Sequence, residues 1–143
     1  MTKAEFYTFF KKIPKAELHL HLEAVIATNT IQKLYKRRNP ALSDEKVSEE
    51  IEKLFTYSNL DGFIKAYLQV QDLYDSEDDF DLVFEDLKQY IVRNGISYTE
   101  IFAAPSAFIK KGFDFSKMVQ NYQKNVKKIK AETGVDVRIL IDV

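Results

Sequence analysis

The chain has 143 residues, of which 45% are hydrophobic and 30% charged, a length and composition typical of one compact globular unit. Lys and Arg total 21 and Asp and Glu total 22, so the formal net charge of −1 offers no general attraction to nucleic acid or to an anionic membrane. The sequence contains no cysteine, which excludes disulfides and thiolate metal ligands and leaves only nitrogen and oxygen atoms to hold a metal.

No stretch of the sequence approaches the roughly 18 consecutive apolar residues that a membrane-spanning helix needs. The first 15 residues carry lysines and an aromatic cluster, but neither a long apolar core nor a cleavage site of small residues. We therefore expect no signal peptide, and a cytoplasmic location is the expectation.

Strands and amphipathic helices are predicted to alternate along the chain. In order, we expect a strand over 15–23, helices over 28–38, 43–55, 58–70 and 76–95, a strand over 96–104, a helix over 116–134 and a strand over 135–143. The expected helix caps are Ser43, Ser58 with Asn59, Ser76 with Asp79, and Ser116, and glycines at 95 and 134 suit helix ends. This order predicts a parallel sheet with right-handed crossovers in a single α/β unit covering residues 1–143.

The two histidines of the chain, His19 and His21, lie two residues apart in the first predicted strand. Because alternate side chains of a strand share a face, we expect both imidazoles on one face with Glu17 and Glu23, and the intervening leucines on the other. Two imidazoles side by side are a natural half of a metal site. The same alternation also suits a half-buried strand that binds nothing, but the preceding proline, the acidic neighbours and the following helix favour the first strand of a β/α fold.

Residues 14–23, PKAELHLHLE, resemble the first barrel strand of the adenosine deaminase family of metal-dependent amidohydrolases, which has the pattern P-K-x-E-L-H-x-H-L-(D/E)-G. The sequence departs from that pattern at Ala24, where the family usually has glycine. The resemblance implies the N-terminal part of a (β/α)8 TIM barrel, with about three parallel strands and their helices in this chain. The barrel is incomplete here, because a closed one needs roughly 250 residues.

Residues 96–101, ISYTEI, resemble the second strand of the same family. The family commonly has an arginine shortly after the glutamate of this strand. This sequence has Phe102 there, and the resemblance gives that residue no role.

The resemblance implies zinc-dependent hydrolytic deamination of adenosine or a related aminopurine, in which a metal-activated water attacks the amino-bearing ring carbon and ammonia leaves. It implies that His19 and His21 are metal ligands and that Glu23 binds substrate, at the position that contacts a ribose hydroxyl in adenosine-specific members. The other ligands and the acid that protonates the purine lie on later strands of the family's barrel, so no catalytic residue is assigned in this portion. We therefore expect the chain alone to be inactive, with its zinc weakly held or absent.

Residues 59–67, NLDGFIKAY, resemble the family's lid helix, within lid-type helices at about residues 43–73. The resemblance implies that Leu60, Phe63 and Ile64 form an apolar, substrate-binding wall against a purine nucleoside or base. The same spacing also suits a helix stripe packed into a core. Gly62 costs about 1 kcal/mol relative to alanine inside a helix, which indicates either close packing or mobility at that position.

Two further hypotheses stay open from the sequence. A related amidohydrolase acting on adenine, a nucleotide or another cyclic amidine would carry the same strand motif. A non-catalytic half-barrel would instead bind a partner or self-associate through its open strand edges, because three parallel strands leave backbone groups unpaired on both sides.

Overall fold

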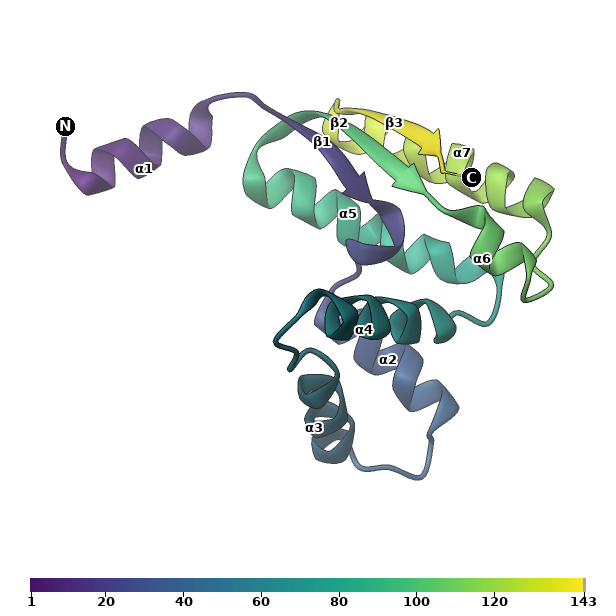
Figure 1. The fold of residues 1–143 in the computed structure, drawn as a ribbon. Helices are drawn as coiled ribbons and strands as arrows, with labels where there is room; N and C mark the ends of the chain where they lie inside the picture. The colour runs from purple at the N-terminus through teal and green to yellow at the C-terminus, as the bar shows by residue number, and fades with distance from the viewer. Residues whose placement is uncertain (143) are drawn as a thin grey trace.

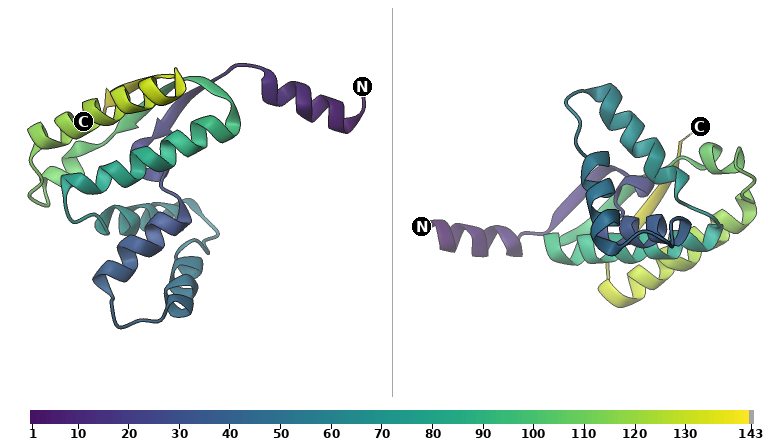
Figure 2. Two further views of the ribbon diagram at one scale, coloured as in Figure 1. Left: turned by 180° about the vertical axis from the view of Figure 1, so that it is seen from behind. Right: turned by 90° about the horizontal axis from the view of Figure 1, so that it is seen from below.

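The sheet of the molecule has three parallel strands in the order β1 (Lys15–His21), β2 (Ile96–Ala103) and β3 (Asp136–Ile141), in a computed structural model that describes residues 1–142. Helices α5 (Phe80–Asn94) and α7 (Phe115–Thr133) pack against each other and against this sheet, and together they cover one of its faces (Figure 1). Figure 2 shows the two helices in front of the sheet when the molecule is turned by 180°. The predicted α/β class with parallel strands is confirmed.

A helical lobe separates β1 from α5 in the sequence. The elements of this stretch are η1 (Leu22–Ala24), α2 (Thr28–Arg38), α3 (Asp44–Leu54), α4 (Leu60–Asp72) and η2 (Glu77–Asp79). The lobe lies at the carboxyl end of β1, where α4 contacts η1 (Figure 1). Its three helices confirm the helices predicted between residues 28 and 70, and the first strand ends at His21 rather than at residue 23 because the chain turns into η1.

Two helices had no counterpart in the sequence prediction: α1 (Lys3–Lys12) and α6 (Pro105–Ile109). Helix α1 extends away from the remainder of the molecule in Figure 1, and none of its residues is buried. A capping box formed by Thr2 and Glu5 closes its first turn. No helix within residues 1–142 is both long and apolar enough to cross a membrane.

Side-chain caps fix the starts of α3, α4 and η2 as the sequence predicts. The Ser43 hydroxyl accepts a hydrogen bond from the Lys46 N–H, and Asn59 Oδ1 accepts one from the Gly62 N–H at 2.9 Å. Ser76 and Asp79 form the predicted capping box. Each cap satisfies a backbone N–H that has no partner within its helix.

The predicted cap of α7 is wrong. Asp114, not Ser116, is the N-cap, because its carboxylate accepts a hydrogen bond from the Lys117 N–H at 3.0 Å and starts the helix two residues earlier. At the other end, Gly134 adopts a positive φ of 76° as the C-cap, a conformation that glycine reaches without steric cost.

The core lies between the sheet and its covering helices and continues into the lobe. Its largest fully buried side chains are Tyr74, Phe80, Phe84, Phe108, Leu22, Leu34, Ile51, Leu87, Ile91, Ile101, Met118 and Ile129. Phe80 lies at the centre of the aromatic part, edge-on to Tyr122 at 5.1 Å and to Phe108 at 5.0 Å between ring centroids. This edge-to-face geometry adds about 0.5–1.5 kcal/mol per pair beyond the buried area.

A bidentate ion pair between Arg37 and Asp79 ties α2 to η2. The two guanidinium nitrogens of Arg37 each donate to one Asp79 oxygen at 2.7 Å, and the Asp75 N–H donates to Asp79 Oδ2. Asp79 is only 5% exposed. Burial alone would raise the pKa of Asp79, but the Arg37 guanidinium and the backbone donors outweigh it and lower that pKa.

We expect Asp79→Asn to lower the free energy of unfolding by about 1.5–3 kcal/mol at pH 7, because it removes a charge-assisted hydrogen-bonded pair. A carboxylate whose pKa is lower in the folded state stabilises the protein above its unfolded pKa of about 3.9 and loses that contribution as the pH falls through the folded value. Urea unfolding at pH 7 and pH 3 should therefore show a difference between wild type and variant that shrinks in acid.

The matched control for this prediction is Asp72→Asn, since Asp72 pairs with Lys111 at an exposed position. We expect a change of under about 1 kcal/mol there at either pH. A loss at Asp79→Asn that is the same at both pH values would contradict the ion-pair argument.

Candidate functional site

A β-bulge interrupts β1 at the histidine motif. Glu17 pairs with Thr99 and Leu20 pairs with Ile101, so two residues of β1 stand opposite one residue of β2. His19 lies inside the bulge with a φ of +64°, and it is the one non-glycine residue among 1–142 with a positive φ. Backbone in this region is uncommon for a residue with a Cβ, although histidine is found there more often than most.

The bulge reverses the side-chain alternation of the strand. Glu17 and Leu20 both point toward the covering helices: the Tyr90 hydroxyl of α5 donates to Glu17 Oε2 at 3.1 Å, and Leu20 packs against the core. The prediction that Glu17 shares a face with the histidines is therefore wrong, because simple alternation does not hold across an extra residue. Leu18, predicted to lie with the other leucines, is instead 57% exposed.

The rings of His19 and His21 lie side by side on the opposite face of the sheet, which we call the histidine face. Their ring centroids are 5.5 Å apart. The Phe102 ring of β2 lies against both imidazoles, with centroid distances of 4.9 Å to His19 and 5.8 Å to His21. The two residues thus present neighbouring nitrogen donors at the carboxyl end of β1, as their sequence spacing suggests.

Two imidazoles meet part of the ligand requirement of a catalytic zinc site. Catalytic zinc takes three protein ligands, and neutral histidine nitrogen is among its preferred donors. Within residues 1–142, no cluster of three or more His, Asp or Glu side chains could hold a metal ion. His19 and His21 thus offer two neighbouring nitrogen donors, and residues 1–142 bring no third His, Asp or Glu side chain into a cluster with them.

Glu23 is a fully buried carboxylate directly after β1, in η1. Its Oε1 accepts a hydrogen bond from the Ala104 N–H at 2.9 Å, and its Oε2 accepts one from the Tyr67 hydroxyl at 3.3 Å. Burial raises the pKa of Glu23, and these two donors oppose that effect by favouring the charged form. Burial and the neighbouring Glu23 carboxylate also raise the pKa of Tyr67.

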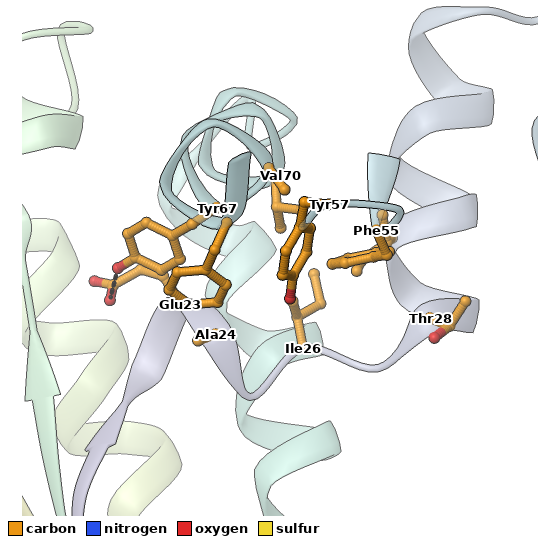
Figure 3. Close-up of a pocket in the computed structure, with 11 residues that line it drawn as sticks. Glu23, Ala24, Ile26, Thr28, Phe55, Tyr57, Tyr67 and Val70 are labelled. Atoms are coloured by element: carbon orange, nitrogen blue, oxygen red, sulfur yellow. Dashed lines mark hydrogen bonds between the residues drawn. The ribbon is translucent and has the colours of Figure 1, made fainter. Parts of the chain in front are cut away.

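A pocket with a volume of about 240 Å³ lies between η1, the start of α2, and α4. Figure 3 shows Glu23 and Tyr67 pointing toward each other on one side of this pocket, with Tyr57 and Phe55 on the other. Its lining is largely apolar and contains no lysine or arginine; it includes Glu23, Ile26, Phe55, Tyr57, Phe63 and Tyr67. The pocket can therefore accept a flat, uncharged group beside one buried carboxylate.

Of the three residues of α4 that were predicted to contact substrate, only one lines the pocket. Phe63 lines the pocket. Leu60 and Ile64 are not among its lining residues: Leu60 is the first residue of α4 and is 70% exposed, and Ile64 is rotated by about 100° around the helix from Phe63. Their contact with substrate stays a prediction.

Sequence reasoning missed Tyr67, which lines the pocket one helical turn after Phe63. The spacing of four residues was a usable signal, because residues at i and i+4 share a helix face. Phe55 and Tyr57 were also missed, since they lie in the link between α3 and α4, where no periodicity indicates direction. A Cβ at Gly62 would lie 2.7 Å from Tyr57 Cβ, so close packing accounts for this glycine.

Three parallel strands in chain order, connected by helices, match the first part of a β/α barrel. The family model described as "Adenosine deaminase" matches residues 14–143. The chain belongs to the adenosine deaminase family.

Among the curated relatives, an adenine deaminase from Crocosphaera subtropica is 30% identical over 135 residues, covering 94% of this chain and 41% of the relative. An N6-methyl-AMP deaminase from Danio rerio is 28% identical over 136 residues, covering 94% of this chain and 38% of the relative. The chain thus spans about two-fifths of the length of the curated relatives it matches.

Among solved structures, an amidohydrolase from Burkholderia ambifaria with bound zinc superposes with a TM-score of 0.81 at 15% identity. The match covers 99% of this chain and 38% of that one. It shows that the two share a fold, and it confirms the predicted partial barrel.

We expect Glu23→Ala to lower the free energy of unfolding by about 1–3 kcal/mol, because the Ala104 N–H would lose its acceptor in a buried place. Glu23→Gln keeps both the volume and one oxygen acceptor, and its cost should stay below about 1.5 kcal/mol. Urea unfolding of the two variants at neutral pH measures the difference. Equal losses of unfolding free energy in the two variants would show that the charge of Glu23, rather than its hydrogen-bond acceptor for the Ala104 N–H, stabilises the contact between η1 and the end of β2.

Proposed function

We propose that this chain supplies the first part of the active site of a zinc-dependent enzyme that deaminates an aminopurine by hydrolysis. The observation that carries the proposal is the juxtaposition of His19 and His21 at the carboxyl end of β1, in a chain of the adenosine deaminase family. The carboxyl end of the strands is where barrel enzymes of this architecture place their chemistry. The relatives named above deaminate aminopurines according to their descriptions, which supports the same class of reaction here.

In this proposal the two imidazoles each donate one nitrogen to the metal. When bound, zinc lowers the pKa of a water molecule to about 7 and so supplies a nucleophile at neutral pH. Two ligands fall short of the three that catalytic zinc takes, so we expect the 143-residue chain alone to hold zinc weakly and to be inactive.

The pocket supports an uncharged purine base or nucleoside as the substrate. The rings of Phe55, Tyr57 and Phe63 offer aromatic and apolar surface to a flat heterocycle, and no lysine or arginine lines the pocket to receive a phosphate. This lining favours a base or nucleoside over a nucleotide such as the substrate of the Danio rerio relative.

Glu23 is proposed to receive a substrate hydroxyl. Its Oε1 is held by the Ala104 N–H, whereas its Oε2 accepts only the longer hydrogen bond from Tyr67 at 3.3 Å. A hydroxyl in the pocket would replace Tyr67 on Oε2 and leave the backbone contact intact. This arrangement assigns Glu23 to recognition of the substrate.

Two finer expectations from the sequence belong to the same proposal: a cytoplasmic location, and self-association through the edges of the sheet. β1 and β3 are the outer strands of the three-stranded sheet in the described part of the chain. Backbone groups on such edges can pair with a second copy. A concentration-dependent increase in sedimentation coefficient is expected, and a strictly monomeric species would contradict it.

We expect His19→Ala and His21→Ala each to weaken binding of Zn²⁺ by at least about tenfold while the circular dichroism spectrum stays unchanged, since each removes one of two nitrogen ligands. The control is Glu17→Gln, because Glu17 lies on the helix-covered face and should not affect the metal. Competition titration with a chromophoric zinc chelator measures all three. Unchanged affinity in both histidine variants would contradict the ligand assignment.

We expect Phe63→Ala to raise the KM for an aminopurine nucleoside about tenfold, because it removes an aromatic surface from the pocket. Leu68→Ala is the matched control on the same helix, because Leu68 is exposed and does not line the pocket, and we expect a change of under about twofold. The assay is the purine absorbance change on deamination, with the protein expressed from its complete coding sequence. A panel of adenosine, adenine and N6-methyl-AMP distinguishes the substrates, and no turnover of any of them would contradict the proposed function.

A further inference from the structure

The Phe102 ring is the one aromatic side chain that contacts both candidate metal ligands within the described residues. Phe102 stands opposite His21 in the register of β1 and β2, and its ring centroid lies 5.8 Å from that of His21 and 4.9 Å from that of His19. Phe102 is only partly buried, so the core does not account for it. Its place on the histidine face of β2 makes it a neighbour of His19 and His21 rather than of the covering helices.

The bulge in β1 and the ring of Phe102 both affect the side chains of His19 and His21. The extra residue and the positive φ of His19 bring both imidazoles onto the histidine face. His19 remains exposed there, and an exposed imidazole is free to change rotamer in the absence of metal. The contact with Phe102 restricts that freedom on both rings at once.

We propose that Phe102 is a positioning residue that holds the imidazoles of His19 and His21 in the relative orientation seen in the structure before metal binds. The inference rests on the proposed function in one respect, that the two histidines are metal ligands. Groups held in their bound geometry lose less conformational freedom on binding, which raises affinity without any new contact to the ligand. Phe102 itself donates no atom to the metal.

The first test needs no metal. The chain has two histidines, so its imidazole protons give two resolvable sets of NMR signals. In the wild type we expect nuclear Overhauser effects from the Phe102 ring to both imidazoles, and ring-current shifts on both. Phe102→Leu should weaken the nuclear Overhauser effect between the two imidazoles, whose ring centroids lie 5.5 Å apart, whereas Phe102→Tyr, which keeps the ring, should preserve it.

The second test measures affinity. We expect Phe102→Leu to weaken binding of Co²⁺ about 3- to 10-fold, the range that an aromatic contact of this kind supports, and Phe102→Tyr to stay within about twofold of wild type. Urea unfolding of both variants checks that the fold is retained. Phe102→Met, which fills a similar volume without an aromatic ring, replaces the leucine variant if that variant does not fold.

The outcomes separate this inference from the proposed function. An inter-imidazole nuclear Overhauser effect in Phe102→Leu as strong as in the wild type, or an equal Co²⁺ affinity in the two proteins, would overturn the positioning role. Absence of Co²⁺ binding in the protein expressed from its complete coding sequence would instead contradict the metal assignment of His19 and His21, and the NMR comparison would still decide whether Phe102 orients the rings.

Discussion

A single buried carboxylate connects the parts of this molecule on which the candidate site depends. Glu23 follows β1 directly, accepts from the N–H of Ala104 just after β2, and accepts from Tyr67 on α4. The ends of two neighbouring strands and the helix beside them therefore meet at one side chain that is inaccessible to solvent. A buried carboxylate is costly unless donors satisfy it, so these three segments are held in one arrangement.

The direction of the two histidine side chains depends on a different feature, the β-bulge in β1. The bulge places Glu17 against Tyr90 in the helix layer and both imidazoles on the other face, where Phe102 lies against them. The left-handed conformation at His19 costs energy for a residue with a Cβ, and such strain is found preferentially where function requires a particular side-chain direction. The regularly paired residues of β1 stabilise the sheet, and the bulge between Glu17 and Leu20 sets the direction of the histidine side chains.

The pocket and the histidine pair are adjacent but unlike in character. The pocket has aromatic walls with one carboxylate, whereas the histidine face carries nitrogen donors beside a partly exposed ring. Both lie at the carboxyl end of β1, where the lobe of α2, α3 and α4 follows the strand (Figure 1). In the proposed enzyme the lobe recognises the purine, and the strand contributes metal ligands.

The amino-acid sequence by itself determined the parallel sheet, the family, the proximity of His19 to His21, and the order of the three strands with helices α2, α3, α4, α5 and α7. These follow from hydrophobic periodicity, from capping residues and from a contiguous motif, all of which are local. The lid-helix motif predicted Leu60, Phe63 and Ile64 alike, and only the tertiary structure shows that Phe63 lines the pocket. The cap of α7 was misplaced by two residues, since Asp114 and Ser116 are both good capping residues and only the fold selects between them.

Only the tertiary structure decided the face of Glu17, the contacts of Phe102 and the burial of Glu23. The bulge is a mismatch between two strands more than 70 residues apart, and no pattern within β1 alone reveals it. Likewise, the donors to Glu23 come from Tyr67 and Ala104, which are distant in sequence. Side-chain direction in a strand is a local property only while the pairing stays regular, and at this site the pairing with β2 determines it.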